Sequence, residues 1–302
     1  MILTKKNKLL LKTVLICIII VIFIITIIIY FLLKNKKEKF EGSKNYEEEV
    51  LLKEPLNDIH TININTPNNS YIPKNIYLTW ETSDIEKMPP NMKESIELLK
   101  SVNNDCNVYI FDKDHRVNFI KKYFKTEVLD AYNSLVPGAF KADVWRYCVL
   151  YKYGGIYQDI KMQPINGFKY SEILVNDKEY YVKDIDGSGG GVYNAVLICK
   201  PNNKVLLKTI NNIIENVKNK YYGESSLYPT GPMLIKKFFT EKEINDMEMQ
   251  LAVEYDSENN DIHIVKFNGR QILKMYNGYR QEVKKLGMKH HYHMWVDKEI
   301  YQ

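Results

Sequence analysis

An uncharged run over residues 13–33, TVLICIIIVIFIITIIIYFLL, limits the fold of this chain more than any other feature. As a helix its 21 residues extend ~30 Å, which is the thickness of the hydrocarbon core of a bilayer. A secretory signal peptide has a shorter apolar region and a small-residue cleavage site, whereas lysine-rich residues 34–37 follow here. No polar stripe interrupts the run, as it would in a helix at the surface of a core. The run therefore predicts a transmembrane anchor.

The positive charge of the chain is concentrated around this run. Residues 1–39 hold eight lysines and one glutamate, whereas residues 41–302 hold 34 Lys and Arg against 36 Asp and Glu. A slightly acidic body gives no support for the basic face that nucleic acids bind, so we expect no nucleic-acid partner. Lysines flank both ends of the run, so the positive-inside comparison of the two ends is nearly a tie.

The rest of the chain divides into a basic tail over 1–12, a stem or linker over 34–70 and a folded domain over 71–302. The linker is rich in Lys, Glu and Asn and shows little apolar periodicity. In the domain, apolar strands alternate with helical patterns, which predicts an α/β fold with a mostly parallel sheet. We expect strands at 76–80, 108–111, 156–159, 180–185, 195–199, 262–267 and 271–274, and helices at 90–100, 112–124, 140–153, 205–220 and 231–239.

One segment, KADVWRYCVLYKYGGIYQD over 141–159, places charged residues where such a sheet binds ligands. Asp143 and Arg146 are three apart and share one face of the predicted helix. The glycine pair at 154–155 ends that helix, and a short strand then brings Asp159 to the carboxyl edge of the sheet. A carboxylate there can hold a divalent metal, and the metal can hold a diphosphate. Alternatively, Asp143 and Arg146 form an ordinary surface pair and Asp159 is a turn residue.

The segment resembles a motif, K-A-D-x-x-R-Y-x-x-L-x-x-x-G-G-x-Y-x-D-x-D. This motif is typical of the DXD-type glycosyltransferase sugar-binding-region family, the Och-type mannosyltransferase group or family 32, and more distantly of glucosylating bacterial toxins. Residues 72–80, IPKNIYLTW, resemble the opening strand of the family, with Tyr77 in place of its usual His. Residues 194–201 and 230–232 resemble later blocks. The resemblance covers roughly residues 72 to 240, with a weaker similarity at Trp295. A match of this length is specific evidence for the family.

The resemblance implies a GT-A type nucleotide-sugar-binding fold and a retaining hexosyltransferase. The donor is then a nucleoside-diphosphate sugar, with mannose expected and galactose or glucose possible, and the acceptor is a glycan, glycolipid or glycoprotein. It also implies a single-pass type II membrane protein, with the catalytic domain on the lumenal side of a Golgi- or ER-like membrane. Residues 13–33 are then its contact with the membrane.

The resemblance further implies four donor-binding residues. Trp80 stacks near the base, and Asp143 hydrogen-bonds hydroxyls of the ribose or sugar. Arg146 contacts the sugar or the phosphates through its planar guanidinium. Tyr157 completes this set.

The catalytic part of the motif departs from the family. Asp159 is expected to ligate Mn²⁺ or Mg²⁺, but the second carboxylate of the D-x-D is replaced by Lys161. Either Asp159 still holds a metal with help from a residue such as His293, or Lys161 itself neutralises the diphosphate. Loss of catalysis, leaving a membrane protein that binds sugar or nucleotide, is the other alternative. Trp295 is expected near the leaving phosphate.

Overall fold

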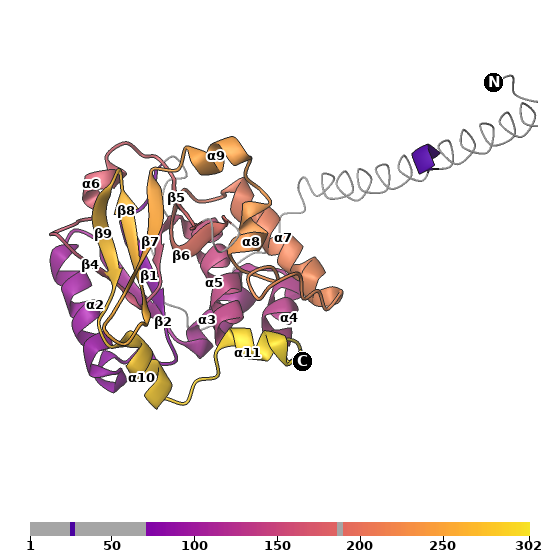
Figure 1. The fold of residues 1–302 in the computed structure, drawn as a ribbon, viewed down its shortest axis with the longest axis horizontal. Coiled ribbons are helices and arrows are strands. Elements are labelled where there is room, and N and C mark those ends of the chain that lie inside the picture. Colours follow the sequence, from indigo (N-terminus) through magenta and orange to yellow (C-terminus); the bar gives the residue numbers. More distant parts are fainter. Residues whose placement is uncertain (1–24, 28–70, 186–189) are drawn as a thin grey trace, which may run out of the picture. The chain divides into compact units, whose positions relative to one another are not determined.

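The computed structural model describes residues 25–27, 71–185 and 190–302 (Figure 1). The predicted tail at 1–12, most of the predicted anchor at 13–33 and the predicted linker at 34–70 lie outside these residues. None of the helices among the described residues combines the length and apolarity needed to cross a bilayer. The anchor and the orientation of the chain therefore stay predictions.

Residues 71–185 and 190–302 build an α/β fold around one nine-stranded sheet in the order β2-β1-β3-β6-β5-β7-β8-β9-β4. The strands are β1 Asn75–Thr79, β2 Asn107–Phe111, β3 Gly155–Gln158, β4 Met162–Pro164, β5 Tyr180–Lys183, β6 Val192–Cys199, β7 Met249–Tyr255, β8 Asp261–Phe267 and β9 Arg270–Met275. Among the described strands, the pairs β1–β2, β1–β3 and β5–β7 are parallel, and the other five pairs are antiparallel. The sheet is mixed, so the expectation of a mostly parallel sheet is wrong.

The sequence of strand β6 shows why a parallel sheet is expected. All eight of its residues are buried, which gives the continuous apolar run that parallel strands show. Yet β6 runs antiparallel to both of its neighbours, β3 and β5. Burial on both faces by packed layers produces the same sequence pattern whatever the strand direction.

The two faces of the sheet bury different clusters. In β1, Tyr77 belongs to one cluster, whereas Ile76 and Leu78 belong to the other, as the alternation of a strand requires. Helix α2 packs on one side, and α3, α5 and α7 lie on the other (Figure 1). The described helices are η1 Ile85–Lys87, α2 Pro90–Val102, α3 Lys113–Tyr123, α4 Thr126–Ser134, α5 Gly138–Tyr153, α6 Ser171–Leu174, α7 Lys204–Lys218, α8 Pro232–Lys236, α9 Glu241–Asn245, α10 Tyr279–Lys285 and α11 His291–Val296.

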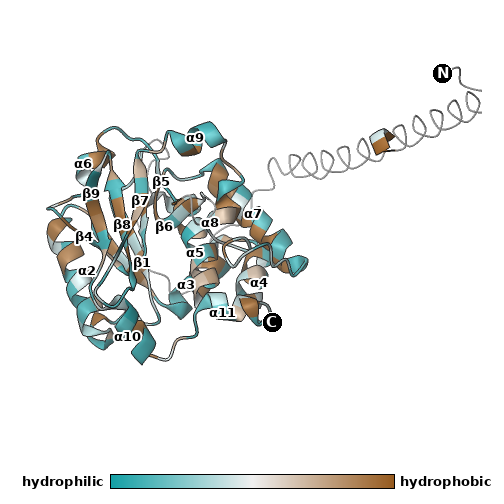
Figure 2. Ribbon diagram, viewed as in Figure 1, coloured by the Kyte–Doolittle hydropathy of each residue, from teal (hydrophilic) through white to brown (hydrophobic). Residues whose placement is uncertain are grey.

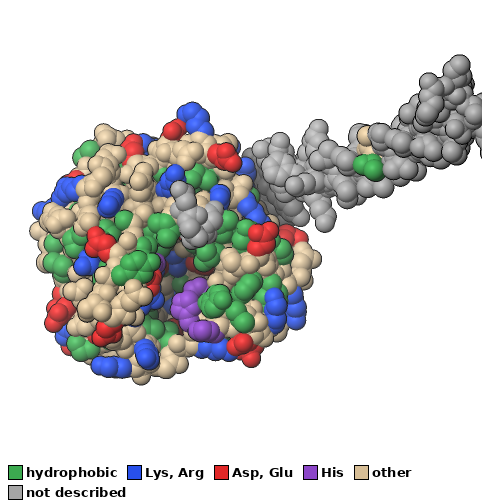
Figure 3. All heavy atoms as spheres, viewed as in Figure 1, with side chains coloured by type: hydrophobic (Ala, Val, Ile, Leu, Met, Phe, Trp, Pro, Cys, Tyr) green, Lys and Arg blue, Asp and Glu red, His purple; other side chains and the backbone are tan. Residues whose placement is uncertain are grey.

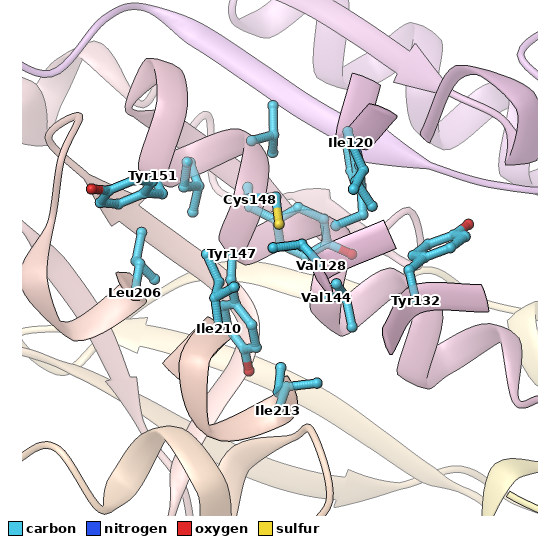
Figure 4. Close-up of a cluster of buried hydrophobic side chains, with 14 of the residues drawn as sticks. Ile120, Val128, Tyr132, Val144, Tyr147, Cys148, Tyr151, Leu206, Ile210 and Ile213 are labelled. Carbon is cyan, nitrogen blue, oxygen red and sulfur yellow. The ribbon is translucent and has the colours of Figure 1, made fainter. Parts of the chain in front are cut away.

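Helix α5 is the central helix of this packing. Val144, Cys148 and Tyr151, the stripe that the sequence predicts to face the core, are buried against side chains of α3, α4 and α7 (Figure 4). Eleven of its sixteen residues are buried. The helix carries apolar segments, whereas α10 is mostly hydrophilic (Figure 2). A helix held on all sides can fix its polar side chains in one position.

Gly154 and Gly155 turn the chain from α5 directly into β3. Gly154 has φ +63° and Gly155 has φ +105°, backbone conformations that favour glycine. A Cβ atom on Gly155 would lie 2.7 Å from the carbonyl oxygen of Asn75, and one on Gly154 would lie 2.6 Å from Pro201 Cδ. The pair therefore allows both a sharp turn and close approach of neighbouring backbone.

The turn after β3 joins distant parts of the sheet. Residues 159–161 alone separate β3, near one edge of the strand order, from β4, the last strand at the other edge. Four Cα steps span at most ~15 Å, so the sheet must curl until these strands are close. The curl brings β8, β9 and α10 towards the carboxyl end of β3.

Candidate active site

Asp159 lies at the carboxyl end of β3, as the sequence predicts. Its backbone N–H donates to Ala195 O over 2.7 Å, which fixes it against β6. Tyr77 pairs with Tyr157 in the parallel β1–β3 ladder, so Trp80 also follows directly on the same edge. Trp80 is half-buried and packs on the cluster that contains α2. This edge is where ligands of α/β sheets bind.

The carboxylate of Asp159 contacts three side chains. Its Oδ1 accepts a hydrogen bond from Tyr157 Oη over 2.7 Å and lies 3.3 Å from Arg146 Nη2. Its Oδ2 lies 3.2 Å from Lys161 Nζ. The side chain of Asp159 is still 21% exposed. Asp159 is therefore held between two cations at the edge of the core.

Arg146 joins Asp159 to Asp143. Its Nη2 lies 3.2 Å from Asp143 Oδ1, and its Nη1 donates to Asn194 O over 2.5 Å. Its guanidinium stacks on the ring of Tyr157, 4.3 Å from the centroid. The predicted i,i+3 pairing is confirmed, but Arg146 and Asp143 are 5% and 6% exposed, so the surface-pair alternative is wrong.

Asp143 receives two further hydrogen bonds from outside its helix. Asn194 Nδ2 donates to its Oδ1 over 2.9 Å, and Thr230 Oγ1 donates to its Oδ2 over 2.6 Å. Tyr147 Oη donates to Thr230 O and accepts from Asn194, which closes the network. A carboxylate accepts about four hydrogen bonds, so little capacity remains on Asp143 for a ligand hydroxyl.

Burial and neighbouring charges shift the pKa values of these groups in different directions. Burial alone would raise the pKa of Asp159, but Arg146 and Lys161 outweigh it and hold that pKa below its usual range. Burial raises the pKa of Asp143, and Arg146 offsets this only in part. Burial opposes the charge of Lys161, yet Tyr193 and Asp159 raise its pKa above the usual value. Lys161 is therefore a stable cation at neutral pH.

A second network lies behind Lys161. The ammonium of Lys161 lies 5.4 Å from the centroid of the Tyr193 ring. Tyr193 Oη lies 2.8 Å from His263 Nδ1, and His263 Nε2 lies 2.9 Å from Asp261 Oδ2. Arg280 of α10 pairs with Asp261 in turn. Burial, with a smaller effect of Lys161, lowers the pKa of His263 to about 4, so its ring is neutral at pH 7.

The histidines before and on α11 lie beside the same region. Burial lowers the pKa of His291 to about 3, and the neighbouring His290 and Lys161 lower it further. Figure 3 shows histidine side chains at the rim of a hollow in which Lys or Arg atoms are visible. His291 packs on Phe140 of α5, which fixes α11 against the central helix.

His293 and Trp295 make other contacts. His293 is exposed and lies against His290 and Tyr292. The indole N–H of Trp295 donates to Tyr222 O over 2.7 Å, so this donor is already used. The predicted role of Trp295 beside a leaving phosphate stays a prediction.

The residues present do not fit a divalent metal. Within the described ranges, no group of three or more His, Cys, Asp or Glu could hold one, and the predicted Asp159–His293 pair stays a prediction. Both oxygens of Asp159 already face donors, and two of those donors, Arg146 and Lys161, are cations. A third positive partner would meet electrostatic repulsion there.

The structure thus brings together five of the predicted site residues: Asp143, Arg146, Tyr157, Asp159 and Lys161. Four residues that complete the networks are not among the site residues predicted from the sequence: Asn194, Thr230, Tyr193 and His263. Asn194 and Thr230 do lie in blocks that resemble the family, so part of the signal was present. The alternation of Asp261 and His263 along one strand face was a further signal.

The segment that holds the motif is similar to known glycosyltransferases. Residues 89–179 match the family described as glycosyltransferase sugar-binding region containing DXD motif. Inositol phosphoceramide mannosyltransferase 3 of Schizosaccharomyces pombe is 26% identical over 193 residues, 63% of this chain and 50% of that protein. The uncharacterized glycosyltransferase L373 of Acanthamoeba polyphaga mimivirus is 33% identical over 91 residues, 30% of this chain and 36% of that protein. The chain spans half or less of the curated relatives that it matches.

Two solved structures are also similar. The PaToxG glycosyltransferase has a TM-score of 0.41 at 19% identity, covering 56% of this chain and 69% of that one. The UDP-bound glycosyltransferase domain of the YGT toxin has a TM-score of 0.34 at 12% identity, covering 58% and 66%. The family match and the curated relatives confirm the predicted family resemblance and the prediction of a transferase.

Proposed function

We propose that this chain, whose residues 89–179 match the glycosyltransferase sugar-binding region family, transfers a hexose from a nucleoside-diphosphate sugar with retention of configuration. The acceptor is a glycan, a glycolipid or a glycoprotein, and the α/β domain works as a GT-A type fold. The observation that carries the proposal is the cluster at the carboxyl edge of β3, in which buried Asp143 and Arg146 meet partly exposed Asp159 and Lys161.

This cluster suits a departing diphosphate. Sugar transfer leaves negative charge on the nucleoside diphosphate, and fixed cations beside it lower the barrier. Arg146 is rigidly held by Asp143 and by the Tyr157 ring, so its planar group needs no reorganisation. Lys161 supplies a second cation with more access to solvent than Arg146, 19% exposed against 5%. Trp80 at the same edge is the proposed platform for the base.

Mannose is the proposed sugar, with galactose and glucose as the alternatives. The support is the similarity to a mannosyltransferase that acts on a phosphoceramide, over 63% of this chain. That similarity also makes a glycolipid a reasonable first acceptor to test.

Residues 13–33 are proposed as the anchor of a type II protein whose catalytic domain is lumenal. Protease protection of sealed vesicles that contain the full chain tests this orientation.

Donor hydrolysis and transfer test the activity directly. The full chain in detergent is incubated with GDP-mannose, UDP-galactose and UDP-glucose, and release of GDP or UDP is followed. Turnover of one of these donors is expected, and NMR of the product gives the anomeric configuration. Asp159→Asn keeps the size of the side chain and removes its charge, so it should abolish turnover. Absence of turnover with every donor overturns the proposed transfer, and absence of nucleotide binding as well excludes a nucleotide-sugar site altogether.

Binding without transfer is the second candidate, favoured by Lys161 at the position where the family motif has an aspartate. It predicts that a nucleotide sugar binds but is neither hydrolysed nor transferred. Calorimetric binding of an intact donor, with no released nucleotide after prolonged incubation, distinguishes it from the enzyme.

A further inference from the structure

The charges of the site suggest which group balances a bound diphosphate. Asp143 and Asp159 contribute two negative charges, and Arg146 and Lys161 contribute two positive ones. The cluster is neutral as it stands, whereas an aspartate at 161 would leave two negative charges unbalanced. Without a bound ligand, the cluster therefore attracts a divalent cation less strongly than two unbalanced carboxylates would.

We propose that the ammonium of Lys161 takes the functional place of the divalent cation, so that this chain binds the nucleoside diphosphate without metal. The inference rests on the proposed function and names the group that meets the phosphates. It also decides between the two alternatives that the Asp159-Ile160-Lys161 segment leaves open.

The position of Lys161 fits this role better than that of Arg146. The N–H groups of Arg146 point to Asn194 O, Asp143 and Asp159, and its face lies on a ring, so little remains for a ligand. Lys161 has three N–H donors, of which one faces Asp159 Oδ2 over 3.2 Å. Tyr193 is a second neighbour of this ammonium. The Lys161 side chain is still 19% exposed, against 5% for Arg146, so it is the more accessible cation for a ligand.

The network behind Lys161 holds it in this position. Asp261 is an acceptor only, so His263 Nε2 carries the proton that faces it over 2.9 Å. His263 Nδ1 then accepts from Tyr193 Oη over 2.8 Å, which directs the lone pairs of the tyrosine oxygen away from the histidine. Burial raises the pKa of Tyr193 to about 12, so the phenol stays neutral. Tyr193 and His263 are therefore positioning residues for Lys161.

The neighbouring histidines do not replace this cation. The pKa of His291 lies at about 3 and that of His290 is also lowered, chiefly by burial. Burial therefore disfavours a positive charge on both rings. Lys161 is the cation that combines contact with Asp159 and partial exposure in this part of the site.

Metal binding and nucleotide binding test the inference separately by titration calorimetry on the full chain. With MnCl₂ alone, wild type should show no saturable binding, whereas Lys161→Asp should bind Mn²⁺ because it gains a second carboxylate. With UDP and GDP, the affinity of wild type for its preferred nucleotide should be the same in EDTA as in MnCl₂. Lys161→Asp should bind that nucleotide only when Mn²⁺ is present.

A neutral variant and a matched control keep the test decisive if Lys161→Asp folds poorly. Lys161→Met keeps most of the side-chain length and should weaken nucleotide binding at least ~10-fold, with or without Mn²⁺, which corresponds to the loss of one charge-assisted contact. Lys169→Asp makes the same charge change at an exposed position eight residues later and should alter neither binding.

The two possible failures are distinct. Saturable Mn²⁺ binding by wild type, or loss of nucleotide binding in EDTA, overturns the inference about Lys161. Absence of UDP and GDP binding under every condition overturns the proposed function itself. Unchanged nucleotide affinity in Lys161→Met also overturns the inference, because the ammonium would then contribute nothing to binding.

Discussion

Asn194 of β6 donates a hydrogen bond to Asp143 of α5 over 2.9 Å, although 51 positions separate them in the sequence. The backbone oxygen of the same asparagine accepts from Arg146, so one residue contacts both members of the helix pair. A buried carboxylate keeps its charge only when such donors replace water. The stability of the site therefore depends on β6 as much as on the motif segment.

Asn194→Ala should lower the free energy of unfolding by about 1–3 kcal/mol, because a buried charged acceptor loses a donor. Urea unfolding followed by circular dichroism measures this. Asn133→Ala, at an exposed position of α4, is the control and should change stability by less than about 0.5 kcal/mol. Equal effects of the two substitutions would show that the contact with Asp143 contributes little.

Gly155→Ala should destabilise the chain by more than about 3 kcal/mol, because it combines left-handed backbone strain with a steric clash. The added Cβ atom would meet Asn75 O at 2.7 Å, and backbone of β1 cannot move aside without breaking the sheet. Gly167→Ala is the matched control, since φ is +68° there and no atom lies within 4 Å. It should cost only about 1 kcal/mol, and a similar melting temperature for both variants would contradict the clash.

Tyr157→Phe should lower stability by about 1.5–3 kcal/mol, the range for a hydrogen bond to a charged group. The ring that stacks on Arg146 is kept, so only the 2.7 Å contact with Asp159 Oδ1 is removed. The pKa of Asp159 should rise towards its usual value, which NMR titration of a chain labelled at the aspartate carboxyl carbons can follow. Tyr255→Phe, at a largely exposed tyrosine, should change neither quantity.

Stability should fall as the pH is lowered from 6.5 to 4, partly through His263. Its pKa is about 4 in the folded chain and 6.5 ordinarily, so in this window the unfolded chain binds the proton and the folded chain does not. The loss amounts to roughly 3 kcal/mol from this residue. Melting temperatures across this range should fall less in His263→Asn, whose side-chain oxygen can still accept from Tyr193.

The matched comparison is His291→Asn. The pKa of His291 is about 3 in the folded chain, so this histidine also makes stability fall as the pH is lowered. Each substitution should remove part of the slope, and the double substitution should remove more than either. A slope in His263→Asn that equals that of wild type would mean that the histidine is already protonated in the folded chain at pH 6.

The local part of the site could be predicted from the sequence. Helix periodicity places Asp143 beside Arg146, and a short strand after two glycines carries Asp159 to the sheet edge. These relationships depend on few residues of intervening chain, so the geometry of one helix and one strand decides them. Likewise α3 begins at Lys113 after the Asp112 cap, within one residue of the expected start.

The long-range part could not be predicted in this way. Asn194 reaches Asp143 through the antiparallel β3–β6 register, and His263 reaches Tyr193 because the sheet curls. Neither the direction nor the register of β6 is visible in a run that is apolar throughout. Strand β7 was missed although Met249, Leu251 and Val253 alternate with other residues, a pattern typical of a half-buried strand.

The turn at 159–161 has a consequence for the order of assembly during synthesis. The carbonyl oxygen of Lys161 accepts from Tyr276 N over 2.9 Å, and β4 directly after it pairs only with β9 among the described strands. Chains emerge from the ribosome with the N-terminal part first. The helix, the glycines and Asp159 are therefore translated long before the strand that fixes Lys161. A nascent chain stalled before β9 would hold the motif in full and yet lack a formed site.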